Sequence, residues 1–213
     1  MIRGLLYAKL IMPWIGKEYQ TKTRFMYVDM EKISHMKKEQ AMNDNVPFVS
    51  SNDVLTSWFL QNAKDCPIGL MAINFRNRLE GHASNTAGNY VDAIFYRKED
   101  SARPALIRQS ISDPTNLKRV VTSNDVPSTL ELATNNVALV SSWASFAAGD
   151  KVNLPSVTEL LHMPVVDMFS PPSICLCVVF RARSKQLAIM LISTADKVVN
   201  LINPDFKSDE EFR

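Results

Sequence analysis

The chain has 213 residues, of which 46% are hydrophobic and 22% charged, an ordinary globular composition with enough apolar material for a core. Its formal net charge of +2 is too small to indicate binding to nucleic acid or to a membrane surface. The apolar run at the start is interrupted by Lys9 and Pro13, so it is too short to span a bilayer. These features exclude a nucleic-acid-binding or membrane-spanning role.

The start of the chain predicts a linker, a strand and a helix. Residues 1–23 resemble a linker whose apolar side chains need a surface to cover, and residues 24–206 are expected to form one domain. Within this domain Arg24–Val28 predicts a short strand. Asp29 follows directly and can cap a helix.

A second helix is predicted from Ser50. Ser50 can act as its N-cap, and Asp53 follows three residues later, a capping-box arrangement with Asp in place of Glu. Apolar residues then recur at helical spacing through Trp58, which predicts one buried face. Pro67 ends the helix.

The strand that follows carries an unusual polar end. Side chains alternate between the faces of a strand, so Asn74, Arg76 and Arg78 share one face while Met71 and Ile73 share the other. Two interpretations stay open at this point. The strand can be an edge strand whose end reaches solvent, or the arginines can bind a carboxylate or phosphate through their planar forks.

The rest of the chain predicts further helices, a strand and a hairpin. A helix is expected from Ser101, restarting at Asp113-Pro114, and a short one from Pro127. Apolar runs predict strands at Val137–Trp143, Ile174–Arg181 and Leu187–Ser193, the last two joined at Ser184-Lys185, and then a helix at Ala195–Asn203 and a charged tail, residues 207–213. This order predicts a two-layer α/β fold, a mixed and mostly antiparallel sheet with helices on one side.

The three cysteines are expected to be structural. Cys175 and Cys177 are separated by one residue on a predicted strand, a spacing suited neither to zinc nor to an ordinary disulfide, and Cys66 stands apart. We expect buried thiols in a reducing compartment, which favours the cytoplasm and no metal site.

Several short segments resemble, in the same order, motifs of the chloramphenicol-acetyltransferase-like superfamily, which includes BAHD acyltransferases and peptide-synthetase condensation domains. The Ser50 helix resembles the S-S-x-x-A-L helix of this superfamily. Asn74–Arg78 is similar to its D-x-R-x-R strand with Asn in place of Asp, Ala87–Tyr90 to its F-G-N segment, and Val140–Trp143 to its S-W strand. The resemblance covers only the second of the two similar halves of such enzymes.

The resemblance implies a site between two halves. In the family the first half supplies a His-x-x-x-Asp motif whose His is the general base, and whose Asp pairs with an arginine of the second half. Arg76 or Arg78 would be that arginine, with Asn74 beside it at the interface. Asn89, Ser141 and Ser142 would line the tunnel between the halves. The co-substrate of a complete enzyme would be acyl-coenzyme A, with no cofactor held by this chain.

None of the three histidines has the setting of the family base. His35 lies among lysines on a helix face that is expected to be solvated, and His82 lies in a polar loop. His162 is followed by Asp167 at a spacing one residue too long, and Pro164 between them breaks any helix. The chain therefore contains no expected catalytic residue.

Together these features predict the C-terminal half of a coenzyme A-dependent acyltransferase, inactive without its other half. The alternative is a non-catalytic binding module for a partner domain, a carrier protein or an acyl ligand. The chain can also be a fragment whose other half is encoded upstream. In each case its partners would be the missing half or small acyl donors and acceptors, and an exposed interface would favour self-association.

Overall fold

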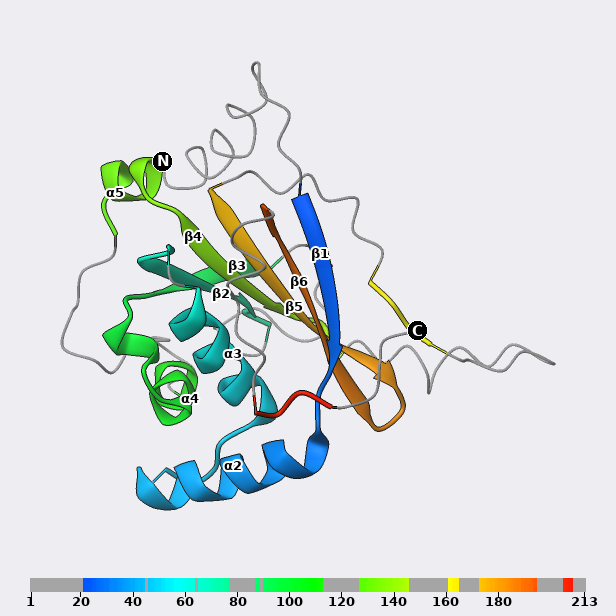
Figure 1. The fold of residues 1–213 in the computed structure, drawn as a ribbon. Coiled ribbons are helices and arrows are strands. Elements are labelled where there is room, and N and C mark those ends of the chain that lie inside the picture. The colour runs from blue at the N-terminus through cyan, green and yellow to red at the C-terminus, as the bar shows by residue number, and fades with distance from the viewer. Residues whose placement is uncertain are drawn as a thin grey trace.

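The computed structural model describes residues 21–44, 46–63, 65–76, 87–88, 90–112, 127–145, 161–164, 173–194 and 205–208. These residues form a six-stranded mixed sheet with its main helices packed on one face (Figure 1). The strands are β1 (Thr21–Tyr27), β2 (Ile68–Asn74), β3 (Val91–Tyr96), β4 (Val137–Ser142), β5 (Ile174–Arg183) and β6 (Gln186–Thr194). The predicted two-layer architecture is confirmed.

The sheet order brings distant parts of the chain together. It reads β1-β6-β5-β4-β2-β3, with β4 parallel to β2 and to β5 and the other neighbours antiparallel. Because β2, β4 and β5 run in the same direction, their C-terminal ends meet at one edge of the sheet. We call this edge the carboxyl edge.

Two of the helices begin where their capping residues predict. Asp29 accepts hydrogen bonds from the first turn of α2 (Met30–Asn43), and Ser50 and Asp53 form a complete capping box at the start of α3 (Ser51–Asn62). The remaining helices are the 3-10 helix η2 (Glu99–Ser101), α4 (Pro104–Ser112) and α5 (Thr129–Thr134). None of the described helices is long and apolar enough to cross a membrane.

Helix α3 packs closely on the sheet because Gly69 leaves room for it. A Cβ atom at Gly69 would stand 2.8 Å from a methyl carbon of Leu60, which is buried in α3. The largest core cluster lies in this layer and joins α2, α3 and α4 to alternate residues of the strands. Its members from the sheet include Met26, Met71, Ile73, Ile94, Ala138, Val140, Cys175, Cys177, Ile189 and Leu191.

The opposite face of the sheet is also apolar. The residues of opposite parity in β5 and β6, such as Val178, Phe180 and Met190, are buried there. The short helix α5 adds Leu132 to a smaller cluster with Ile68 and Val137 on this side. The apolar sequences of β5 and β6 are thus explained by burial on both faces.

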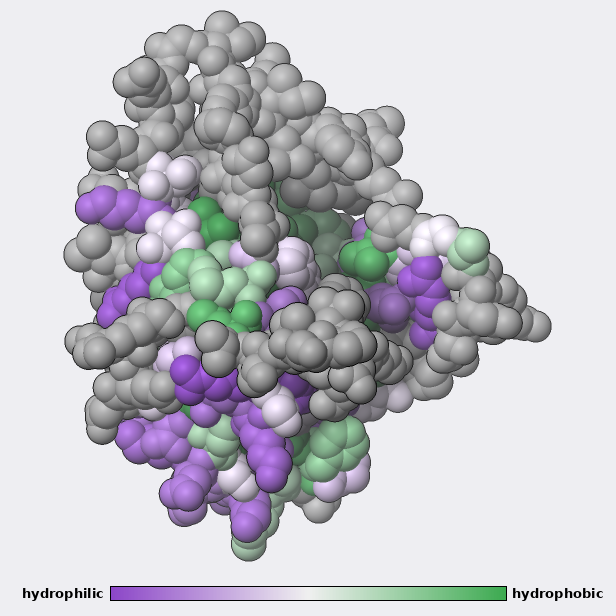
Figure 2. Space-filling view, turned by 90° about the vertical axis from the view of Figure 1, so that its right-hand side faces the viewer, coloured by the Kyte–Doolittle hydropathy of each residue, from purple (hydrophilic) through white to green (hydrophobic). Residues whose placement is uncertain are grey.

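Hydrophilic residues are prominent at the end of the molecule where α2 lies (Figure 1 and Figure 2). Figure 2 shows hydrophilic residues at the lower end of the molecule, where α2 lies in Figure 1, and hydrophobic residues nearer the middle. Helix α2 has Ile33 as its one buried residue. His35 is exposed on this helix, and its Nδ1 lies 4.0 Å from Oε2 of Glu39, too far for a hydrogen bond. This agrees with the solvated helix face expected around His35.

The described boundaries differ from the predicted ones by a few residues. Strand β1 begins at Thr21 rather than Arg24, and Lys207, the first residue of the expected tail, forms a bridge with Val28. The hairpin turns at Ser184-Lys185 as predicted. The helices predicted at Asp113-Pro114 and at Ala195–Asn203 lie outside the described residues.

Candidate functional site

The carboxyl edge gathers the described members of the predicted site. Asn74 ends β2, and its pairing with Val91 places Gly88 and Tyr90, which precede β3, beside it. Ser141 and Ser142 end β4 at the same edge. Arg78 and Asn89 lie outside the described residues.

Arg76 is bound at this edge by neighbours from both sides of the β2–β3 connection. Its guanidinium group donates a hydrogen bond to the carbonyl oxygen of Gly88, and its Cζ lies 5.0 Å from the ring centroid of Tyr90. Its backbone N–H donates to Oδ1 of Asn74 at 3.0 Å. The structure therefore brings Asn74 and Arg76 together with the two residues that flank Asn89.

The two serines of β4 lie on opposite faces of the sheet because they are adjacent in one strand. Ser141 pairs with Val178, and its Oγ accepts a hydrogen bond from the indole N–H of Trp143 at 3.0 Å. Ser142 pairs with Val179, whose side chain is in the helix-covered core. The two serines therefore face different sides of the sheet, and Ser141 is the one beside Trp143.

His162 reaches the same edge, although no feature of the sequence placed it there. Its backbone N–H donates to the carbonyl oxygen of Ala182 at 2.9 Å, near the C-terminal end of β5. Its ring Nδ1 lies 3.1 Å from the carbonyl oxygen of Arg181. A carbonyl oxygen can only accept, so Nδ1 carries the proton and a neutral ring keeps its lone pair on Nε2. His82, which was also considered as a base, is outside the described residues.

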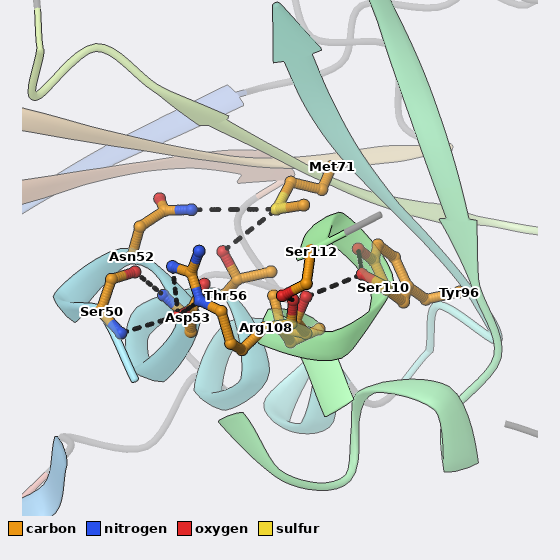
Figure 3. A network of polar contacts seen from close by, with 10 residues as sticks. Ser50, Asn52, Asp53, Thr56, Met71, Tyr96, Arg108, Ser110 and Ser112 are labelled. Carbon is orange, nitrogen blue, oxygen red and sulfur yellow. Dashed lines mark hydrogen bonds and ion pairs between the residues drawn. The ribbon is translucent and has the colours of Figure 1, made fainter. Parts of the chain in front are cut away.

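A buried ion pair behind the carboxyl edge joins α3 to α4 (Figure 3). Nε and Nη2 of Arg108 donate to Oδ2 of Asp53 at 2.8 and 2.7 Å, and the backbone N–H of Ser50 donates to the same oxygen at 2.7 Å. Arg108 also stacks on Phe48, with Cζ 4.3 Å from the ring centroid. The sequence identified Asp53 as a capping residue, but no local pattern indicates a partner 55 residues away.

Two further charged groups stabilise helix ends. Burial lowers the pKa of Lys98, whose ammonium group donates to main-chain carbonyl oxygens at the end of α3, including that of Ala63 at 3.0 Å. At the start of α5 the pKa of Glu131 falls from 4.5 to about 2, mainly because the backbone N–H of Ser128 donates to it and also because of Arg97 at 2.7 Å. Both groups support the fold rather than the carboxyl edge.

The cysteines have the setting that their spacing predicted. Cys66, Cys175 and Cys177 are buried free thiols. Burial raises the pKa of the Cys177 thiol, which keeps it protonated and unreactive.

Comparison with known proteins identifies the fold. No protein-family model and no curated protein matches the chain. Among solved structures it is similar to F. graminearum TRI101 complexed with ethyl coenzyme A, at 15% sequence identity and a TM-score of 0.59, over 85% of this chain and 47% of that one. Vinorine synthase is similar at 15% identity and a TM-score of 0.58, over 87% of this chain and 47% of that one.

F. sporotrichioides TRI101 complexed with coenzyme A and T-2 gives the same result, at 14% identity and a TM-score of 0.58, over 90% of this chain and 50% of that one. The chain thus has the acyltransferase fold of these neighbours and spans about half their length. The predicted resemblance is confirmed at the level of the fold.

Proposed function

We propose that this chain is the C-terminal half of a coenzyme A-dependent acyltransferase and that it requires a second half to transfer an acyl group to an alcohol or amine. The observation that carries the proposal is the carboxyl edge. Asn74 and Arg76 lie at the end of β2 and Ser141 lies near the end of β4, two segments far apart in the sequence. Both ends belong to one edge of a sheet whose fold is shared with TRI101 over about half of that protein.

The second half would supply the general base. The described part of the chain offers His162 and His35 as imidazole groups, and neither is paired with a carboxylate at hydrogen-bonding distance. A base must reach the proton that it removes, at about 2.6–3.2 Å or through one water. In the proposed complex the partner's base would meet the acyl donor, acyl-coenzyme A, and the acceptor at the carboxyl edge.

One arginine of the Asn74–Arg78 segment would help to hold the two halves together. In this proposal Arg78 would bind a carboxylate of the partner, with Asn74 at the same interface. Asn89 and Ser141 would line the passage for the acyl donor, because residues on either side of Asn89 and the side chain of Ser141 belong to the same edge.

One experiment tests whether the chain is incomplete. Thiol release from acetyl-coenzyme A is measured with the purified chain and a panel of alcohols and amines, and we expect no rate above the uncatalysed one. The matched variants are His162→Ala and His35→Ala, since His35 is exposed on α2. Turnover that disappears only in His162→Ala would refute the proposal and identify His162 as the base.

A second experiment tests the identity of the partner. The coding sequence directly upstream of Met1 and the proteins that copurify with the chain are examined for a His-x-x-x-Asp segment. Co-expression of such a segment should give a complex that releases thiol from acetyl-coenzyme A. If no such segment is found, or if the complex forms and stays silent, the non-catalytic binding module becomes the better explanation.

A further inference from the structure

The connection between β2 and β3 leaves and re-enters the sheet at one point of the carboxyl edge. The pairing of Asn74 with Val91 closes the ladder of these strands, and one further hydrogen bond follows, from the N–H of Phe75 to the carbonyl oxygen of Tyr90 at 2.9 Å. The residue that follows Phe75 is Arg76, whose side chain contacts the other side of this connection.

Arg76 connects the two sides at this point. Its Nη2 donates to the carbonyl oxygen of Gly88 while Nη1 lies 3.4 Å from Oδ1 of Asn74, so one guanidinium group joins the outgoing strand to the incoming one. The same group stacks on Tyr90. A planar guanidinium group can donate in two directions while its flat face stacks on a ring, whereas an ammonium group is a compact charge without a flat face or a fixed fork.

Gly88 has the backbone conformation that this contact needs. Its φ angle is +124°, a region that residues with a side chain rarely adopt. A Cβ atom there would also stand 3.2 Å from the ring of Tyr90, tighter than ordinary contact. Glycine at position 88 thus allows its carbonyl oxygen to accept from Arg76 while the ring of Tyr90 contacts the same guanidinium group.

We propose that Arg76 is a positioning residue that fixes the place and direction at which the chain enters β3, and that it does so without any partner. This deepens the proposed function and rests on it in one respect: the edge at which Arg76 contacts Gly88 and Tyr90 would be the edge that faces the second half. It also separates the roles of the two arginines. Arg76 is committed to its own chain, which leaves Arg78 as the arginine for a partner's carboxylate.

The test is amide hydrogen exchange of the full chain, read at Phe75 and Tyr90. In Arg76→Ala we expect Phe75 to exchange about tenfold faster, the effect of losing one hydrogen bond to a charged group. Amides in the middle of β2 should be unchanged. Arg103→Ala is the matched control, because it removes an exposed arginine from its ion pair with Asp44 and should leave Phe75 unaffected.

Conservative variants separate positioning from general stability. Arg76→Lys keeps the charge but loses the fork, and should exchange like Arg76→Ala. Tyr90→Phe keeps the ring and should exchange like the wild type. The wild type should also show separate, slowly exchanging Nη resonances for Arg76 in cold solution, as expected of a guanidinium group bound on two sides.

Two results would overturn the proposal. One is exchange of Phe75 within twofold of the wild type in Arg76→Ala. The other is full recovery in Arg76→Lys, since charge alone would then suffice. None of these measurements uses acyl transfer. The positioning role of Arg76 can therefore fail while the proposed function stands, and the proposed function can fail while that role stands.

Discussion

Removing Arg108 should be among the most damaging single changes in this chain, because it leaves a buried charge without compensation. Asp53 is fully buried, and three of its hydrogen bonds converge on Oδ2, two of them from Arg108. Its Oδ1 is buried without a hydrogen-bond partner among the described residues. We expect Arg108→Met to lower the free energy of unfolding by about 3–5 kcal/mol, the range for breaking a buried pair from one side.

Two milder variants set the scale for this effect. Ser50→Ala removes the side-chain half of the capping box, where Oγ accepts from the N–H of Asp53 at 3.2 Å, and should cost about 1 kcal/mol. Asp53→Asn keeps the shape but removes the charge. In that background Arg108→Met should cost much less, so the double-mutant cycle should show a coupling of about 2 kcal/mol or more.

Urea unfolding followed by tryptophan fluorescence and circular dichroism gives these free energies by linear extrapolation. Arg108→Met should shift the midpoint with little change in slope. A cost below about 1 kcal/mol, or a cycle that is additive within about 0.5 kcal/mol, would refute the assignment of a stabilising buried pair.

Three further predictions concern single residues. The pKa of Glu131 is lowered to about 2, mainly by the N–H of Ser128, so its contribution to stability is present above about pH 4.5 and is lost as the pH falls toward 2. Glu131→Gln should flatten this part of the curve of stability against pH. An unchanged curve would contradict the shift. Gly69→Ala should destabilise the fold by about 1–3 kcal/mol because its Cβ would collide with Leu60. In a Leu60→Ala background the same substitution should cost less, which a double-mutant cycle in thermal melts would measure. His162→Ala should cost about 1 kcal/mol through the lost hydrogen bond to β5, and a variant as stable as the wild type would show that this bond contributes nothing.

Local features of the fold could be predicted because their causes lie within a few residues. The capping box of α3, the cap of α2 and the turn of the last hairpin each depend on side chains close to the backbone that they satisfy. The alternation of Met71 and Ile73 against Leu70 likewise follows from strand geometry and is confirmed by the two core clusters that they join.

The order of the strands and the partners of the charged residues could not be predicted in this way. Nothing near Asp53 indicates Arg108, and nothing near His162 indicates the end of β5, because each contact joins segments brought together by the whole fold. The faces of Ser141 and Ser142 could have been separated by strand alternation alone, a signal that the motif resemblance obscured. Arg76 was expected at an interface. Its contacts with Gly88 and Tyr90 could not be predicted, because they depend on where the chain returns from β2 to β3.

The position of the last hairpin in the sheet has a consequence for synthesis on the ribosome. Strands β5 and β6 lie between β1 and β4, yet β6 is made last of all the described strands. At about 5–20 residues per second, β1 waits on the order of ten seconds for β6 to appear. During that time β1 lacks the strand that it pairs with, and for most of it α3 lacks its contacts with β5. Slowing translation before β5 should therefore prolong this exposure and increase aggregation of the nascent chain rather than prevent it.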